Sequence, residues 1–110
     1  MSWSIVYCSD AIYAWIDGMP VSMRARYARI TERMTAYGPN LGMPYTRPMD
    51  GGLFEIRAHG REGIARVLYC TLVDRQIVML HGFIKKAEKT PAKELAIAMR
   101  RMKEIKRESP

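Results

Sequence analysis

Residues 53–84, LFEIRAHGREGIARVLYCTLVDRQIVMLHGFI, decide the fold. The first seven of them, 53–59, alternate apolar and polar side chains, which predicts a strand with one buried face and one polar face. Residues 64–73 and 76–84 are apolar on both faces and predict two more strands. Short turns at 59–63 and 74–75 join the three, so we expect an antiparallel meander.

Upstream of the meander, the pattern predicts one strand and two helices. Residues 3–8, WSIVYC, are aromatic and β-branched and favour a strand. Ser9 or Asp10 can cap a short helix that ends at Gly18, and a second helix follows Pro20 and stops at Gly38-Pro39. The Pro- and Gly-rich residues 38–52 are typical of a loop. The second helix carries an apolar stripe of Met23, Tyr27, Ile30, Met34 and Tyr37.

Downstream, a basic link leads into a last helix. The link is residues 85–90, KKAEKT, and Thr90 can cap a helix that begins at Pro91 and continues to about residue 107. The apolar face of this helix is formed by Leu95, Ala98, Met99 and Met102. We therefore predict an α+β fold in the order β-α-α-β-β-β-α. Residues 1–110 form one domain, with a small, mostly antiparallel sheet and the helices packed on one face.

Composition limits the class of protein. The chain has 110 residues and a net charge of +7, of which +1 belongs to residues 1–52 and +6 to residues 53–110. A small basic protein favours a polyanionic partner such as nucleic acid, although solubility alone also explains such a charge. No apolar run is long enough to cross a membrane and the first ten residues do not resemble a secretory signal, so we expect a cytoplasmic protein.

The familiar motifs of catalysis and metal binding are absent from the sequence. It contains no phosphate-binding loop, no GxSxG, no HExxH and no CxxC pair. Two cysteines, Cys8 and Cys70, and two histidines, His59 and His81, do not form a recognisable metal-ligand pattern. We expect neither a metal nor another cofactor, and an enzyme of this sequence would rely on basic groups.

The polar face of the first meander strand and the strand beside it hold the first candidates. Glu55, Arg57 and His59 share one face and suit proton transfer to an anionic substrate, or else form a solvated surface with a cross-strand ion pair. Arg66 interrupts an apolar strand, where it is costly unless it is paired or reaches a cleft. A guanidinium can grip phosphate there, and the alternative is a structural salt bridge, for which Glu55 is the candidate partner.

A second set of candidates lies at the end of the last strand. His81 could serve as a general acid or base, or simply be a packed side chain. Lys85, Lys86 and Lys89 form the densest basic patch, and Phe83 beside them offers a surface on which bases could stack. The alternative is an ordinary solvated run of charge.

These segments resemble a known family. LFEIR at 53–57, GIARVLY at 63–69, IVMLHGFIKKAEKTP at 77–91 and ELAIAMRRM at 94–102 resemble the HigB-like, phage-derived branch of the RelE/ParE toxin superfamily. The HGFxKK sequence at the strand end, followed by TPxxE and a helix with AxxR, is the most specific part. The resemblance is strong over 53–107 and weaker over 1–40.

The resemblance implies the toxin of a type II toxin–antitoxin module. Most such toxins are metal-free endoribonucleases that cleave mRNA in the ribosomal A site, where the 2′-OH of the RNA attacks the adjacent phosphate. It implies an antitoxin partner, typically a helix-turn-helix protein, and roles for particular residues. The implied roles are Glu55 or His81 as base, Arg57 and Arg66 on the phosphate, and Phe83, Lys85, Lys86 and Lys89 on RNA. The alternatives are a gyrase poison of the ParE type and a phage regulatory protein that binds nucleic acid without catalysis.

Overall fold

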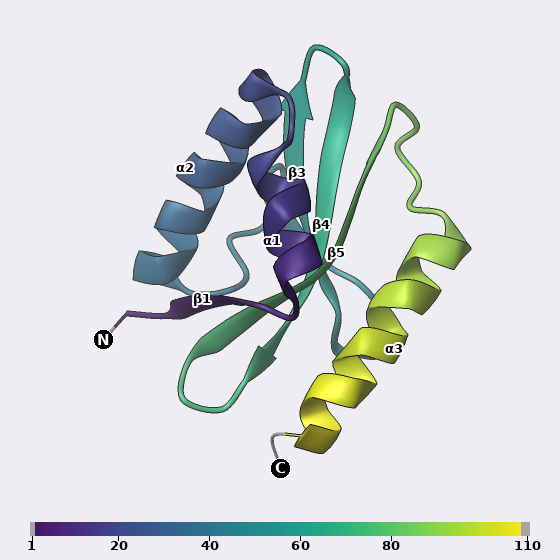
Figure 1. Cartoon of the computed structure of the whole chain (residues 1–110). Coiled ribbons are helices and arrows are strands. Elements are labelled where there is room, and N and C mark those ends of the chain that lie inside the picture. Colours follow the sequence, from purple (N-terminus) through teal and green to yellow (C-terminus); the bar gives the residue numbers. More distant parts are fainter. Residues whose placement is uncertain (1, 109–110) are drawn as a thin grey trace.

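A computed structural model describes residues 2–108 of the chain, and residues 1, 109 and 110 lie outside the described residues. The predicted mixed α+β fold with three helices is confirmed (Figure 1). The helices are α1 (Asp10–Asp17), α2 (Val21–Tyr37) and α3 (Ala92–Glu108). The strands are β1 (Ser4–Tyr7), β2 (Thr46–Pro48), β3 (Phe54–Gly60), β4 (Gly63–Leu72) and β5 (Gln76–Lys85).

The five strands form one sheet in the order β1-β5-β4-β3-β2. The predicted meander is confirmed, because β3 pairs with β4 and β4 with β5, both antiparallel. The N-terminal strand β1 pairs parallel to β5, from Ser4 opposite Gln76 to Tyr7 opposite Met79. After β1 the chain passes through α1 and α2 and enters the sheet again as β2, at the edge opposite β1.

The prediction of an unbroken loop over 38–52 is wrong. Thr46–Pro48 pairs antiparallel with the start of β3, and Asp50–Gly52 forms a 3₁₀ turn. The Pro- and Gly-rich composition hid this short strand, which lies at the sheet edge, where a proline is tolerated. Its consequence is that Arg47 stands directly opposite Glu55.

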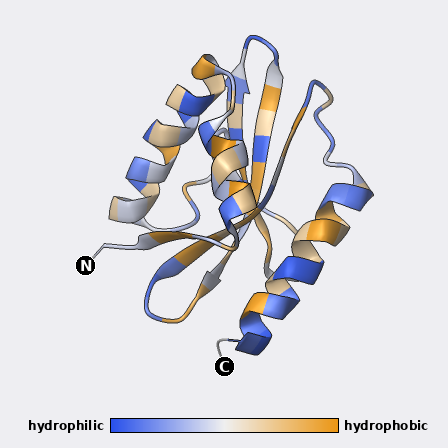
Figure 2. Ribbon diagram, viewed as in Figure 1, coloured by the Kyte–Doolittle hydropathy of each residue, from blue (hydrophilic) through white to orange (hydrophobic). Residues whose placement is uncertain are grey.

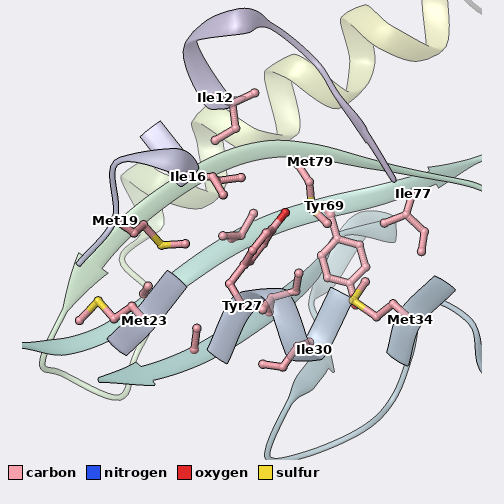
Figure 3. Close-up of a cluster of buried hydrophobic side chains, with 14 residues drawn as sticks. Ile12, Ile16, Met19, Met23, Tyr27, Ile30, Met34, Tyr69, Ile77 and Met79 are labelled. Atoms are coloured by element: carbon pink, nitrogen blue, oxygen red, sulfur yellow. The ribbon is translucent and has the colours of Figure 1, made fainter. Parts of the chain in front are cut away.

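The prediction that all helices pack on one face is also wrong. Figure 1 shows α1 and α2 on one side of the sheet and α3 on the other. The first core, between α1, α2 and the sheet, includes Ile16, Tyr27, Ile30 and Met79 (Figure 3). The second, beneath α3, joins Ala98 and Met102 to alternate residues of the central strands. The physical reason lies in β4, which is apolar on both faces and therefore has to be covered twice.

The helices alternate between apolar and polar residues along their length, as the hydropathy colours of Figure 2 show, and their buried apolar residues face the sheet. Met23, Tyr27, Ile30 and Met34 of α2 are buried against the sheet, as predicted. Tyr37, placed in the same stripe, is instead exposed, because α2 ends there and Gly38 turns the chain away. The Oγ of Ser9 accepts from the amide of Ile12 and caps α1, as expected.

A close contact fixes α1 against β5. Gly82 lies so near the ring of Trp15 that a Cβ added to Gly82 would stand 2.3 Å from a ring carbon. Only glycine leaves room for the indole there, and the contact lies next to an irregularity in the pairing of β4 with β5. Of the helices described over 2–108, none is long and apolar enough to cross a membrane.

Candidate nucleic-acid interface

The candidate residues gather on one face of the sheet, the face that α3 covers at its other end. Arg57 of β3 stands opposite Arg66 of β4, which in turn stands opposite Phe83 of β5. Glu55 stands opposite Leu68, a member of the core beneath α3. Because alternate residues of a strand and cross-strand partners share a face, Glu55, Arg57 and Arg66 form a row of charges on the two neighbouring strands β3 and β4.

Glu55 is completely buried and its carboxylate is enclosed by donors. One oxygen, Oε1, accepts from Nη1 of Arg57 at 2.9 Å and from Nε of Arg47 at 3.1 Å. The other, Oε2, accepts from the hydroxyl of Thr90. With both oxygens occupied and no exposed surface, this carboxylate is a structural anchor in the conformation described.

Arg57 connects the buried carboxylate to the exterior. Its Nη2 donates to Oε2 of Glu88 at 2.5 Å, while its own side chain is almost fully buried. The Glu88 side chain is 81% exposed. Arg57 is thus held between one anion inside the protein and one at the surface.

Arg66 does not reach an open cleft. It is fully buried, and its Nη1 donates to the carbonyl of Lys89 at 2.9 Å, while its Nη2 donates to the carbonyl of Ala87. Its guanidinium carbon lies 5.9 Å from the centroid of the Phe83 ring. The salt bridge to Glu55, which was the structural alternative, is not among the ion pairs of residues 2–108. Burial lowers the pKa of Arg66, and the nearby charge of Glu55 opposes this shift.

The basic link runs over this row of charges. Residues 86–90, which we call the strap, lie between the end of β5 and α3 and carry Lys86 and Lys89 on the exposed side. Lys85 is exposed at the end of β5. Phe83 is buried beneath, between Arg66 and the ring of His81, so it offers no free stacking surface in this conformation.

His81 belongs to a separate group of residues at the α3 end. Its Nε2 lies 2.7 Å from Oε1 of Glu94, and its Nδ1 lies 3.4 Å from Nη1 of Arg101. A neutral ring would donate to Glu94 and accept from Arg101. His81 and Arg101 also line a cavity of about 180 Å³, whose opposite wall includes Trp15 of α1.

The structure therefore brings together Glu55, Arg57 and Arg66 and leaves His81 in a neighbouring group. His59, on the same strand face, is exposed near the β3–β4 turn. The partners of these residues carry no signal in the sequence pattern, and they are Arg47, Glu88, Glu94 and Arg101. Thr90 was predicted to cap α3, and its hydroxyl instead donates to Glu55.

Chemically, this face can bind an anion. The group holds three arginines, at positions 47, 57 and 66, and two carboxylates, at 55 and 88, so it carries one surplus positive charge, and Arg66 is, in the described part of the chain, the arginine without a carboxylate partner. Arginine forks of this kind recognise phosphate in two-point contacts. Within residues 2–108, no three His, Cys, Asp or Glu side chains come close enough to hold a metal ion.

The comparison with protein families gives a family for the chain. The model of the phage-derived protein Gp49-like family matches residues 14–103, which include α2, all strands except β1, and most of α3. No curated protein matches the chain. The match covers well over half of the sequence and contains the whole row of charged residues, so the chain belongs to the phage-derived Gp49-like family, a family of RelE- and toxin-like proteins.

Proposed function

We propose that the protein is the toxin of a type II toxin–antitoxin module and cleaves mRNA without a metal, on translating ribosomes in the cytoplasm. Family membership supports the toxin part of this proposal. The cleavage part rests on one observation, the pairing of Arg57 with Arg66 on one sheet face beneath a lysine-bearing strap.

The two arginines suit the charge that develops during RNA cleavage. When a 2′-OH attacks the adjacent phosphate, the phosphorane-like transition state carries more negative charge than the starting diester. Cations that are fixed in advance stabilise that charge without reorganisation, and removing one such group typically lowers a rate about 10²–10³-fold. Lys85, Lys86 and Lys89 would hold the flanking RNA backbone, as expected from their exposure.

Between the two candidates for the base, the geometry favours His81. Glu55 has no exposed surface and its oxygens already accept three hydrogen bonds. His81 is partly exposed and is oriented by Glu94, whose carboxylate would stabilise the imidazolium formed when Nδ1 takes up a proton. Arg101 would have to turn away from Nδ1 for this step.

The cognate antitoxin would cover the same face. We propose that it contributes acidic or apolar side chains along the strap and α3, where the charge of residues 53–110 is +6. A purified toxin–antitoxin complex in which residues 53–90 stay fully open would contradict this arrangement.

The function is tested by expressing the protein in cells and mapping mRNA 5′ ends. Cuts in phase with the reading frame would support ribosome-linked cleavage. Intact mRNA with growth arrest and altered plasmid supercoiling would point to a gyrase poison. Intact mRNA and normal supercoiling would point to a binding protein without catalysis.

A further inference from the structure

The strap is attached to the sheet through arginine side chains. Arg66 donates to two of its carbonyls, those of Ala87 and Lys89, and Arg57 holds the Glu88 carboxylate. At the end of the strap, Thr90 donates to Glu55. The two arginines proposed to bind phosphate are therefore occupied by the chain itself.

Each of the two arginines has one hydrogen-bond donor without a partner among the described residues. Nε of Arg57 and Nε of Arg66 are buried and have no hydrogen-bond partner. A buried N–H without a partner is destabilising, so a fully adapted structural contact would be expected to satisfy it. Two such donors, on residues that stand opposite each other on β3 and β4, indicate that the present partners do not use all the donors of the two arginines.

Glu88 is the most replaceable of these partners. Its carboxylate has one negative charge, as a phosphodiester does. It binds Arg57 from the protein surface, and the Glu88 side chain is 81% exposed. Glu55, by contrast, is buried and has three donors. An incoming phosphodiester could exchange places with Glu88 without leaving Arg57 unpaired, and the two Nε groups, which are buried in the closed arrangement, would be free donors for it once the strap has moved away.

We propose that Glu88 is an internal substitute for an RNA phosphate and that the strap, residues 86–90, opens when a phosphodiester displaces it. This inference rests on the proposed function, because it assigns Arg57 and Arg66 to the RNA backbone. It adds an autoinhibited state in which the chain covers its own phosphate site. The apparent association constant for RNA is then the intrinsic constant multiplied by the fraction of molecules in which the strap is open.

The test compares two variants of equal charge. Glu88→Gln removes the competing carboxylate, and Glu32→Gln removes an exposed carboxylate from α2, on the opposite side of the sheet. Each raises the net charge from +7 to +8. The probe is a fluorescent single-stranded RNA with 2′-O-methyl groups, which cannot be cleaved. We expect Glu88→Gln to bind it about three- to tenfold more tightly than wild type and Glu32→Gln to stay within about twofold.

A second readout follows the arginines directly. In ¹⁵N NMR spectra, the Nε–H signals of Arg57 and Arg66 should shift when the RNA, or inorganic phosphate, is added, and less phosphate should be needed in Glu88→Gln. Equal affinities for the two variants, or Nε–H signals that do not respond, would overturn the proposal. Tighter binding by Glu88→Gln in a protein that leaves cellular mRNA intact would keep the strap mechanism and refute the proposed nuclease function.

Discussion

The replacement Glu55→Gln tests whether this face is built around a buried anion. The neutral side chain keeps the shape of glutamate but removes the charge that faces Arg57 at 2.9 Å and Arg47 at 3.1 Å. Removing one partner of a buried ion pair costs about 3–5 kcal/mol, because the other charge stays buried. The Arg47 side chain is 33% exposed and water can compensate part of its loss, so we take the lower end, about 3 kcal/mol.

Urea unfolding monitored by circular dichroism measures this loss. A domain of this size has about 5–15 kcal/mol of stability, so a loss of about 3 kcal/mol is readily resolved. The matched control is Glu62→Gln in the β3–β4 turn, an exposed residue expected to change stability by less than about 0.5 kcal/mol. If Glu55→Gln stays within about 1 kcal/mol of wild type, the carboxylate is not an anchor. A stable Glu55→Gln that loses all activity would restore Glu55 as the base.

Three further outcomes follow from the structure. Arg66→Met keeps a long side chain of similar size but removes the guanidinium that holds the strap. We therefore expect a folded protein in which the backbone amides of residues 86–90 exchange hydrogen faster and mRNA cleavage falls about 10²–10³-fold. A folded variant that stays fully toxic would remove Arg66 from the site. Cleavage on pre-formed ribosome complexes should persist in EDTA under conditions that keep the ribosomes intact, and a loss that one divalent ion restores would contradict this. Burial raises the pKa of Tyr27 and Tyr69, so their stabilising contribution is complete below about pH 10, the pKa of an unfolded tyrosine, and decreases as the pH rises above it. Tyr69→Phe should flatten this alkaline decrease in unfolding free energy, and curves with equal slopes would refute the assignment.

The sequence pattern predicted the elements better than their arrangement. The alternation in 53–59 and the apolar runs after it correctly placed β3, β4 and β5, because the period of a strand is visible in a single chain. The prediction that all helices pack on one face of the sheet was wrong, although β4 is apolar on both faces and therefore needs a helix on each side. The short strand β2 was missed because three residues around a proline carry almost no periodic signal.

For the candidate site, the sequence indicated which residues matter but not their partners. Arg66 stood out because a charge in an apolar strand needs compensation, and the structure supplies that compensation from backbone carbonyls, which have no signature in a sequence. Thr90 fitted a helix cap by its position before Pro91, yet tertiary structure directs its hydroxyl to Glu55. The pairing of His81 with Glu94 joins a strand to a helix, a contact that local pattern cannot reveal.

The most direct test of the proposed activity is a reconstituted reaction with purified protein and ribosomes stalled on a defined mRNA. We predict a cut in the codon of the A site that leaves a 2′,3′-cyclic phosphate and a 5′-OH, and a cut that forms about 10²–10³-fold more slowly with Arg66→Met. Protein that binds these ribosomes and leaves the mRNA intact would contradict the account.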